Sequence, residues 1–218
     1  MRTILDKGAP SGGPHNLLVM LPGADNHAAD FFDHGLVDDI RQAGGRCDVL
    51  ALETGIDRYL DGRIVEDMHP VIAEAARDLG AHDIWLLGIS LGGLGALLYA
   101  RAHRPMVAGV LAMSPYIGNR GLVAEIARAG GLARWRNTGH PTLETALLEW
   151  LRGYDGDPAV WPELWLAYAT EDRYAQGHRL LADILPKDRV VTVTGGHDWP
   201  SWKRLWQLLV TAAPSTVA

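Results

Sequence analysis

Cysteine is nearly absent from the sequence: Cys47 is the only one among 218 residues. A single cysteine excludes a disulfide within the chain, and its place at the start of an apolar run indicates a buried side chain rather than a second nucleophile. No apolar stretch approaches the length of a membrane span, and residues 1–14 lack the apolar core of a secretory signal peptide. The expectation is a cytoplasmic protein with no membrane partner.

Runs of basic residues are missing as well. The 20 Lys and Arg residues are scattered among 26 acidic ones, and the net charge is −6. Nucleic acids bind concentrated positive charge, so nucleic acid is not an expected partner. With 48% hydrophobic residues the composition is that of an ordinary globular protein, and the length suits a single domain over residues 1–218. Whether two copies form a homodimer is left open.

Short apolar runs alternate with longer amphipathic stretches, which is typical of a parallel sheet with crossover helices. Several runs are apolar at nearly every position, as in strands that are covered on both faces. The predicted strands are residues 16–21, 47–52, 83–88, 108–114, 163–170 and 189–194, with 3–5 as a further edge strand. The predicted helices are residues 28–43, 64–79, 91–103, 173–184 and 199–211. The pattern predicts an α/β fold with a mostly parallel sheet of about six to eight strands flanked by helices.

The segment 115–162 interrupts this alternation. Its pattern predicts two helices, over residues 121–135 and 142–152, followed by a turn-rich stretch at 153–158. We interpret 115–162 as a small helical insertion over the strand ends rather than as a separate domain.

The run Gly88-Ile89-Ser90-Leu91-Gly92 lies between an apolar stretch and a helix-like stretch. That context predicts a strand, a sharp turn and a helix, with the serine hydroxyl raised above the strand ends. Glycines suit such a turn because it is strained and the backbones pass close together. The serine would also lie at a helix N-terminus, where developing negative charge is favoured. Alone the Gly-x-Ser-x-Gly pattern is weak, but in this context it predicts a nucleophile.

A serine nucleophile needs a base, and the base needs a group that orients it. His197 follows the last predicted strand and precedes the final helix, which places it at the same sheet edge as Ser90. Asp172 follows the strand before that, with Glu171 as an adjacent rival, and we favour Asp172. Along the chain the order is Ser90, Asp172, His197, which is the order found where the nucleophile lies on such a strand-to-helix turn.

Two backbone N–H groups are expected to form an oxyanion hole, one from Leu91 and the other from Ala24 in the loop after an early strand. Gly23 lets that loop turn closely, and it is expected to line the substrate site together with Asp25 and His27. The remaining candidate for the substrate site is Trp199, which lies two residues past the predicted base.

His27, Asp30 and His34 could share one helical face, at a spacing compatible with metal binding. No fourth ligand is evident, so we favour a solvated helix face. The sequence predicts no metal and no organic cofactor.

Together, the elbow at Ser90, Asp172 and the run Gly-Gly-His-Asp-Trp at 195–199 resemble the α/β-hydrolase superfamily. The last motif is similar to the esterase-D-like group of esterases, whereas residues 22–31 resemble small carboxylesterases and acyl-protein thioesterases. The resemblance implies the α/β-hydrolase fold. Where these families usually carry His-Gly in the oxyanion loop, this chain has Pro-Gly, so only a backbone donor is carried over.

These residues and the resemblance predict a serine hydrolase that cleaves a carboxylic ester or thioester of a small molecule through an acyl-enzyme. The same three side chains would serve an acyltransferase or a peptidase. Hydrolysis and transfer differ in which nucleophile enters second, and the triad does not determine that. An alternative of another class is a catalytically silent hydrolase fold that acts as a binding module. Such a protein usually lacks a member of the triad, and none is missing here.

Overall fold

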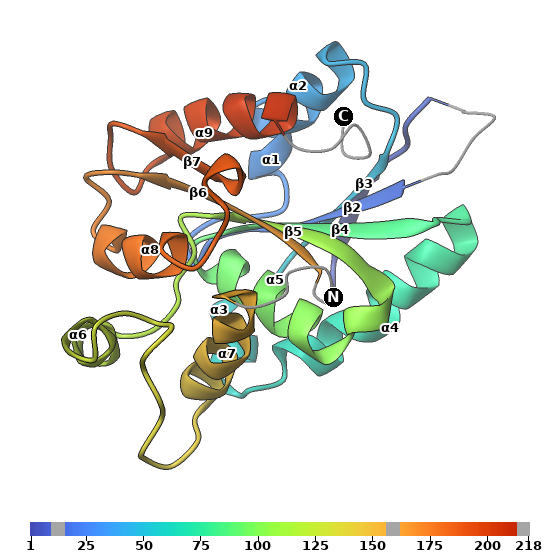
Figure 1. Ribbon diagram of the computed structural model, residues 1–218. Coiled ribbons are helices and arrows are strands. Elements are labelled where there is room, and N and C mark those ends of the chain that lie inside the picture. The colour runs from blue at the N-terminus through green and yellow to red at the C-terminus, as the bar shows by residue number, and fades with distance from the viewer. Residues whose placement is uncertain (10–15, 156–161, 213–218) are drawn as a thin grey trace.

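A computed structural model describes residues 1–9, 16–155 and 162–212. They form a seven-stranded sheet in the order β1-β3-β2-β4-β5-β6-β7 (Figure 1). Its strands are β1 (Thr3–Asp6), β2 (Asn16–Leu21), β3 (Asp48–Leu52), β4 (Asp83–Ile89), β5 (Val107–Met113), β6 (Glu163–Ala169) and β7 (Val190–Val193). Only β1 runs antiparallel to its neighbour, so the predicted mostly parallel sheet is confirmed.

Helices cover both faces of this sheet (Figure 1). The described helices are α1 (Asp30–Asp33), α2 (Leu36–Gln42), α3 (Ile56–Leu60), α4 (Ile64–Leu79), α5 (Leu91–Ala102), α6 (Arg120–Arg128), α7 (Leu143–Leu151), α8 (Ala175–Ala182) and α9 (Trp199–Ala212). Helices α1, α2 and α9 lie on one face, and the other helices lie on the opposite face. None of the described helices is long and apolar enough to cross a membrane.

Successive side chains of each strand point to opposite faces of the sheet, as strand geometry dictates. On β2, Leu17 and Val19 pack with α4 and α5, whereas Leu18 and Met20 pack with α2 and α9. All four are at most 1% exposed. The sheet is therefore buried on both sides, which explains why its strands read as continuous apolar runs.

One predicted helix, residues 28–43, is wrong as a single element. Gly35 takes a left-handed conformation with φ 69° and separates α1 from α2. Before α1 the Asn26 N–H donates to the Gly23 carbonyl and closes a turn. The loop after β2 therefore contains no helix before Asp30, where α1 begins.

In the segment 115–162, α7 matches the predicted helix, but the predicted helix 121–135 ends early, at Arg128. Gly130 and Gly131 both adopt positive φ values, which a helix does not accommodate. The predicted turn at 153–158 lies partly outside the described residues.

These helices join the layer that covers one face of the sheet: α7 packs on α5, and α6 packs on α8. Buried side chains of the segment, among them Trp135 and Leu147, belong to the same core. That the segment also covers the strand ends stays a prediction.

Cys47 is buried, with 4% of its surface exposed, as its sequence context predicts. Burial is the main cause that raises the pKa of its thiol to about 11. A thiol in this state is protonated at neutral pH and unreactive, since only the thiolate is a strong nucleophile.

Candidate active site

Ser90 lies between β4 and α5 with φ 54° and ψ −114°, a conformation that side-chain-bearing residues rarely adopt. Two backbone hydrogen bonds hold this strained turn. The Ser90 N–H donates to the Met113 carbonyl at 3.0 Å, and the Tyr116 N–H donates to the Ser90 carbonyl at 2.9 Å. Strain of this kind costs about 1–3 kcal/mol and persists because the surrounding contacts impose it.

Two glycines make the turn sterically feasible. A Cβ on Gly88 would lie 2.2 Å from the Gly92 carbonyl oxygen, and a Cβ on Gly92 would lie 2.1 Å from the Leu21 carbonyl oxygen. Real Cβ atoms do not approach so closely. The start of α5 is therefore in backbone contact with the ends of β2 and β4, which places Ser90 beside the loop that follows β2.

Gly92→Ala is expected to lower the free energy of unfolding by about 1–3 kcal/mol or more, because the added methyl must displace backbone atoms. Urea unfolding measures the change. Gly139→Ala is the matched control, since its Cβ would meet nothing closer than Asn137 Oδ1 at 3.6 Å. Equal stability of the two variants would contradict the expectation.

Three side chains from separate loops meet at the carboxyl edge of the sheet. Ser90 Oγ lies 2.8 Å from His197 Nε2, and His197 Nδ1 lies 2.7 Å from Asp172 Oδ2. A carboxylate only accepts hydrogen bonds, so the Nδ1–H donates to Asp172 and Nε2 is left to accept from the serine hydroxyl. The His197 side chain is 6% exposed, and that of Asp172 is fully buried.

Burial alone would raise the pKa of Asp172, but hydrogen bonds from His197 and from the Tyr174 N–H, the latter at 2.8 Å, lower it. The carboxylate is thus ionised at neutral pH, in a position to orient and stabilise a charged imidazole. The rival Glu171 is exposed, and its backbone N–H donates to the Gly195 carbonyl at 3.0 Å.

Aromatic rings enclose the imidazole of His197. Tyr174 and Trp202 each contact it edge-on, with ring centroids 5.1 Å away. Trp199, the expected pocket wall, is half-buried and stacks on His34 at 3.9 Å between centroids. Tyr174 was not singled out in the sequence, because its position after Asp172 carries no pattern of its own.

The loop after β2 approaches the serine closely. A Cβ on Gly23 would lie 3.5 Å from the Ser90 Cβ, and the turn closed by Asn26 leaves Ala24 and Asp25 exposed. Leu91 is the first residue of α5, so its N–H has no acceptor within the helix. The two predicted oxyanion donors, the N–H groups of Ala24 and Leu91, therefore lie on two segments that both adjoin Ser90: the loop after β2 and the start of α5.

His27 is tied to a residue that the sequence did not reveal, Glu53, just after β3. His27 Nδ1 lies 2.7 Å from one carboxylate oxygen of Glu53, and the Ala28 N–H donates to the other at 3.1 Å. The hydrogen bond and charge of Glu53 raise the pKa of His27. His27 and His34 thus have different partners, and within the described ranges no group of three or more His, Cys, Asp or Glu is arranged to hold a metal.

His178 on α8, which no sequence pattern marks, is fully buried, and its Nε2 lies 3.0 Å from the Pro115 carbonyl oxygen. Burial lowers its pKa to about 4, so the ring is neutral at pH 7 and Nε2–H donates to that carbonyl. This contact anchors the segment after β5, which carries Tyr116 and its hydrogen bond to Ser90.

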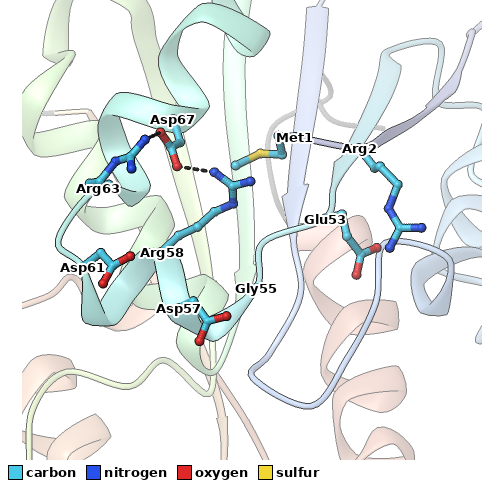
Figure 2. A pocket seen from close by; sticks show the side chains of 9 residues that line it. All are labelled: Met1, Arg2, Glu53, Gly55, Asp57, Arg58, Asp61, Arg63 and Asp67. Atoms are coloured by element: carbon cyan, nitrogen blue, oxygen red, sulfur yellow. Dashed lines mark hydrogen bonds and ion pairs between the residues drawn. The ribbon is translucent and has the colours of Figure 1, made fainter.

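One cavity lies beside Glu53 and another beside Tyr174. One, of about 750 Å³, lies between Glu53 with Arg2 on one side and α3 with the start of α4 on the other (Figure 2). Its lining is polar: besides Met1 and Gly55 it consists of Arg2, Glu53, Asp57, Arg58, Asp61, Arg63 and Asp67. A smaller one, of about 40 Å³, lies beside Tyr174 between α6 and α8. The first is larger, but the second adjoins the ring that contacts His197 and so lies nearer the chemistry.

The elbow, the hydrogen-bonded serine, histidine and aspartate, and the sheet around them define an α/β hydrolase. More specifically, the chain belongs to the serine aminopeptidase S33 family, whose sequence model matches residues 57–184. The match includes Ser90 and Asp172 and ends before His197. The resemblance to the α/β-hydrolase superfamily is thereby confirmed, and the family is one of serine hydrolases. No curated protein matches the sequence.

Solved structures with this fold include the fluorophosphonate-binding serine hydrolase F of Staphylococcus aureus, with a TM-score of 0.71 and 13% identity over 96% of this chain and 90% of that one. The S-formylglutathione hydrolase of the same organism has a TM-score of 0.64 and 14% identity over 93% and 82% of the two chains. The monoacylglycerol lipase of Paleococcus ferrophilus has a TM-score of 0.60 and 19% identity over 98% and 100%. At these identities the likeness establishes the fold.

Proposed function

We propose that this protein cleaves a carboxylic ester or thioester of a small molecule through an acyl-enzyme intermediate. The observation that carries the proposal is the continuous hydrogen-bonded chain from Asp172 through His197 to Ser90, beside the loop that holds Ala24. The proposal needs no metal and no cofactor, since the serine hydroxyl supplies the nucleophile and water the second reactant.

In the first step Ser90 Oγ attacks the carbonyl carbon while His197 Nε2 takes the hydroxyl proton. The negative charge that develops on the carbonyl oxygen is stabilised by the N–H groups of Ala24 and Leu91. The bond to the leaving group then breaks, and His197 donates its proton to the departing alcohol or thiol. Water repeats the sequence on the acyl-enzyme, releasing the acid and restoring the serine.

Asp172 acts through the imidazole. Its hydrogen bond keeps the proton on Nδ1, so that Nε2 faces the serine, and its charge stabilises the imidazolium that forms in each step. The lowered pKa of Asp172 supports this role, because the carboxylate is then ionised at neutral pH.

A peptidase is the second candidate, favoured by the description of the family as serine aminopeptidases. Amide cleavage requires protonation of a poor leaving group by the same His197. Three of the structural neighbours are named as a fluorophosphonate-binding serine hydrolase, an S-formylglutathione hydrolase and a monoacylglycerol lipase. These names support the proposal of ester or thioester cleavage for this chain.

A substrate panel tests the proposal. We expect p-nitrophenyl esters and acyl thioesters of short chain length to turn over at least 100-fold faster in kcat/KM than aminoacyl p-nitroanilides, a difference of about 2.7 kcal/mol in transition-state stabilisation. Added alcohol acceptors measure the partition between hydrolysis and transfer. Preferential cleavage of the anilides would establish the peptidase instead, and folded protein inert to all substrates and to a fluorophosphonate probe would favour a binding module.

A further inference from the structure

The loop from Gly23 to Ala28 is held at both of its ends. At its start, backbone packing against α5 is so tight that only glycine fits at position 92, and Gly23 lies against Ser90. In its middle, the turn closed by Asn26 brings Ala24 to an exposed position. The start of the loop is therefore held by close backbone packing and by the backbone hydrogen bond from Asn26 to Gly23.

At its far end the loop is held by polar contacts. The Glu53 carboxylate accepts from the His27 ring at 2.7 Å and from the Ala28 N–H at 3.1 Å, and Asp30 accepts from the His27 N–H at 2.8 Å. Glu53 stands directly after β3, which pairs with β2, so it is carried by the rigid part of the sheet. Its side chain is 24% exposed, whereas that of His27 is 71% exposed.

We propose that Glu53 is a positioning residue that keeps the Ala24 N–H in place to stabilise the oxyanion. The geometry supports this because a carboxylate with both oxygens engaged fixes the loop in direction as well as in distance. The inference rests on the proposed function, and Glu53 acts through the loop without touching the reacting atoms.

The His27–Glu53 contact also depends on pH. The groups that face His27 are Glu53 and Asp30, which raise its pKa, and Arg2, which together with desolvation lowers it, and the balance is a rise above 6.5. Below the raised pKa the contact is an ion pair. As pH increases through that pKa, the ion pair becomes a neutral hydrogen bond and weakens. The contribution of Glu53 is thus largest on the acidic side and declines on the alkaline side.

Glu53→Ala and Glu53→Gln test the proposal. We expect Glu53→Ala to lower kcat by about 10- to 100-fold, below the loss of about 10²–10³ that follows removal of an oxyanion donor itself, with KM changed less than about two-fold. Glu53→Gln retains an acceptor for the Ala28 N–H and is expected to lie between Glu53→Ala and wild type. The matched control is Asp57→Asn, which removes the same charge from the same cavity, at a residue on α3 whose side chain forms no ion pair within the described ranges (Figure 2).

Each kcat is divided by the active-site titre obtained from complete fluorophosphonate labelling, so that a loss of folded protein is not counted. The pH profile adds a second readout: the alkaline decline in wild-type kcat should disappear in Glu53→Gln. A titre-corrected kcat of Glu53→Ala within two-fold of wild type, or an equal loss in Asp57→Asn, overturns the inference. If the wild-type protein neither reacted with the fluorophosphonate probe nor hydrolysed any ester, the proposed function itself would be overturned. That result differs from an active wild type whose kcat is unchanged by replacing Glu53.

Discussion

Replacing Ser90 by alanine is expected to lower kcat for ester hydrolysis by about 10⁶-fold, since the nucleophile of a serine triad carries most of its rate enhancement. The variant should also fail to react with a fluorophosphonate probe. Its stability should change little, because alanine retains the Cβ that already tolerates φ 54° and only the hydrogen bond to His197 is lost. Steady-state kinetics with a p-nitrophenyl ester and labelling of the folded variant measure both effects.

The neighbouring strand offers a matched control. Ser114, directly after β5, is likewise a serine with a positive φ, 45°; it is fully buried, and its hydroxyl has no hydrogen-bond partner within the described residues. Ser114→Ala should leave kcat within about three-fold of wild type. Substantial activity in Ser90→Ala would mean that the nucleophile has been assigned to the wrong residue.

Asp172→Asn is expected to lower kcat by about 10⁴-fold with little change in KM. An amide in this position donates as well as accepts, so the imidazole tautomer with a proton on Nδ1 is no longer favoured, and the imidazolium loses its stabilising charge. The buried setting intensifies the effect, because the Asp172 side chain is fully buried and no solvent replaces it.

Glu171→Gln removes the same charge one residue away and serves as the control. Glu171 is exposed, so its replacement should alter kcat by less than about three-fold. If Glu171→Gln caused the larger loss, the orienting acid would be Glu171 and not Asp172. Both variants are compared at the same pH and after correction for active-site titre.

The parallel sheet was predictable because its strands are buried on both faces and read as unbroken apolar runs. The placement of Ser90, Asp172 and His197 at strand ends followed from the same reading, and the structure brings their side chains into hydrogen-bond contact. The helix α4 was also predicted with correct bounds despite Pro70, which lies inside the helix at an exposed position.

What the sequence did not show depends on contacts between distant segments. Glu53 is one of many acidic residues until the loop after β2 folds against it, 25 positions from Ala28. Likewise His178 is an ordinary helical residue in the sequence, and only the packing of α8 reveals its bond to Pro115, 63 positions away. Local breaks such as Gly35 were missed because glycine is compatible with either sign of φ, and the pattern does not indicate which one the tertiary structure selects.

The buried Cys47 has a practical consequence for testing thioesters. A thioester substrate releases a thiol, which a chromogenic disulfide reagent detects continuously. Because the only cysteine of the chain is 4% exposed and its thiol has a pKa of about 11, the enzyme itself should consume almost none of that reagent. Release of the thiol product can therefore be measured with the unmodified wild type at high enzyme concentration, without first blocking the cysteine of the enzyme.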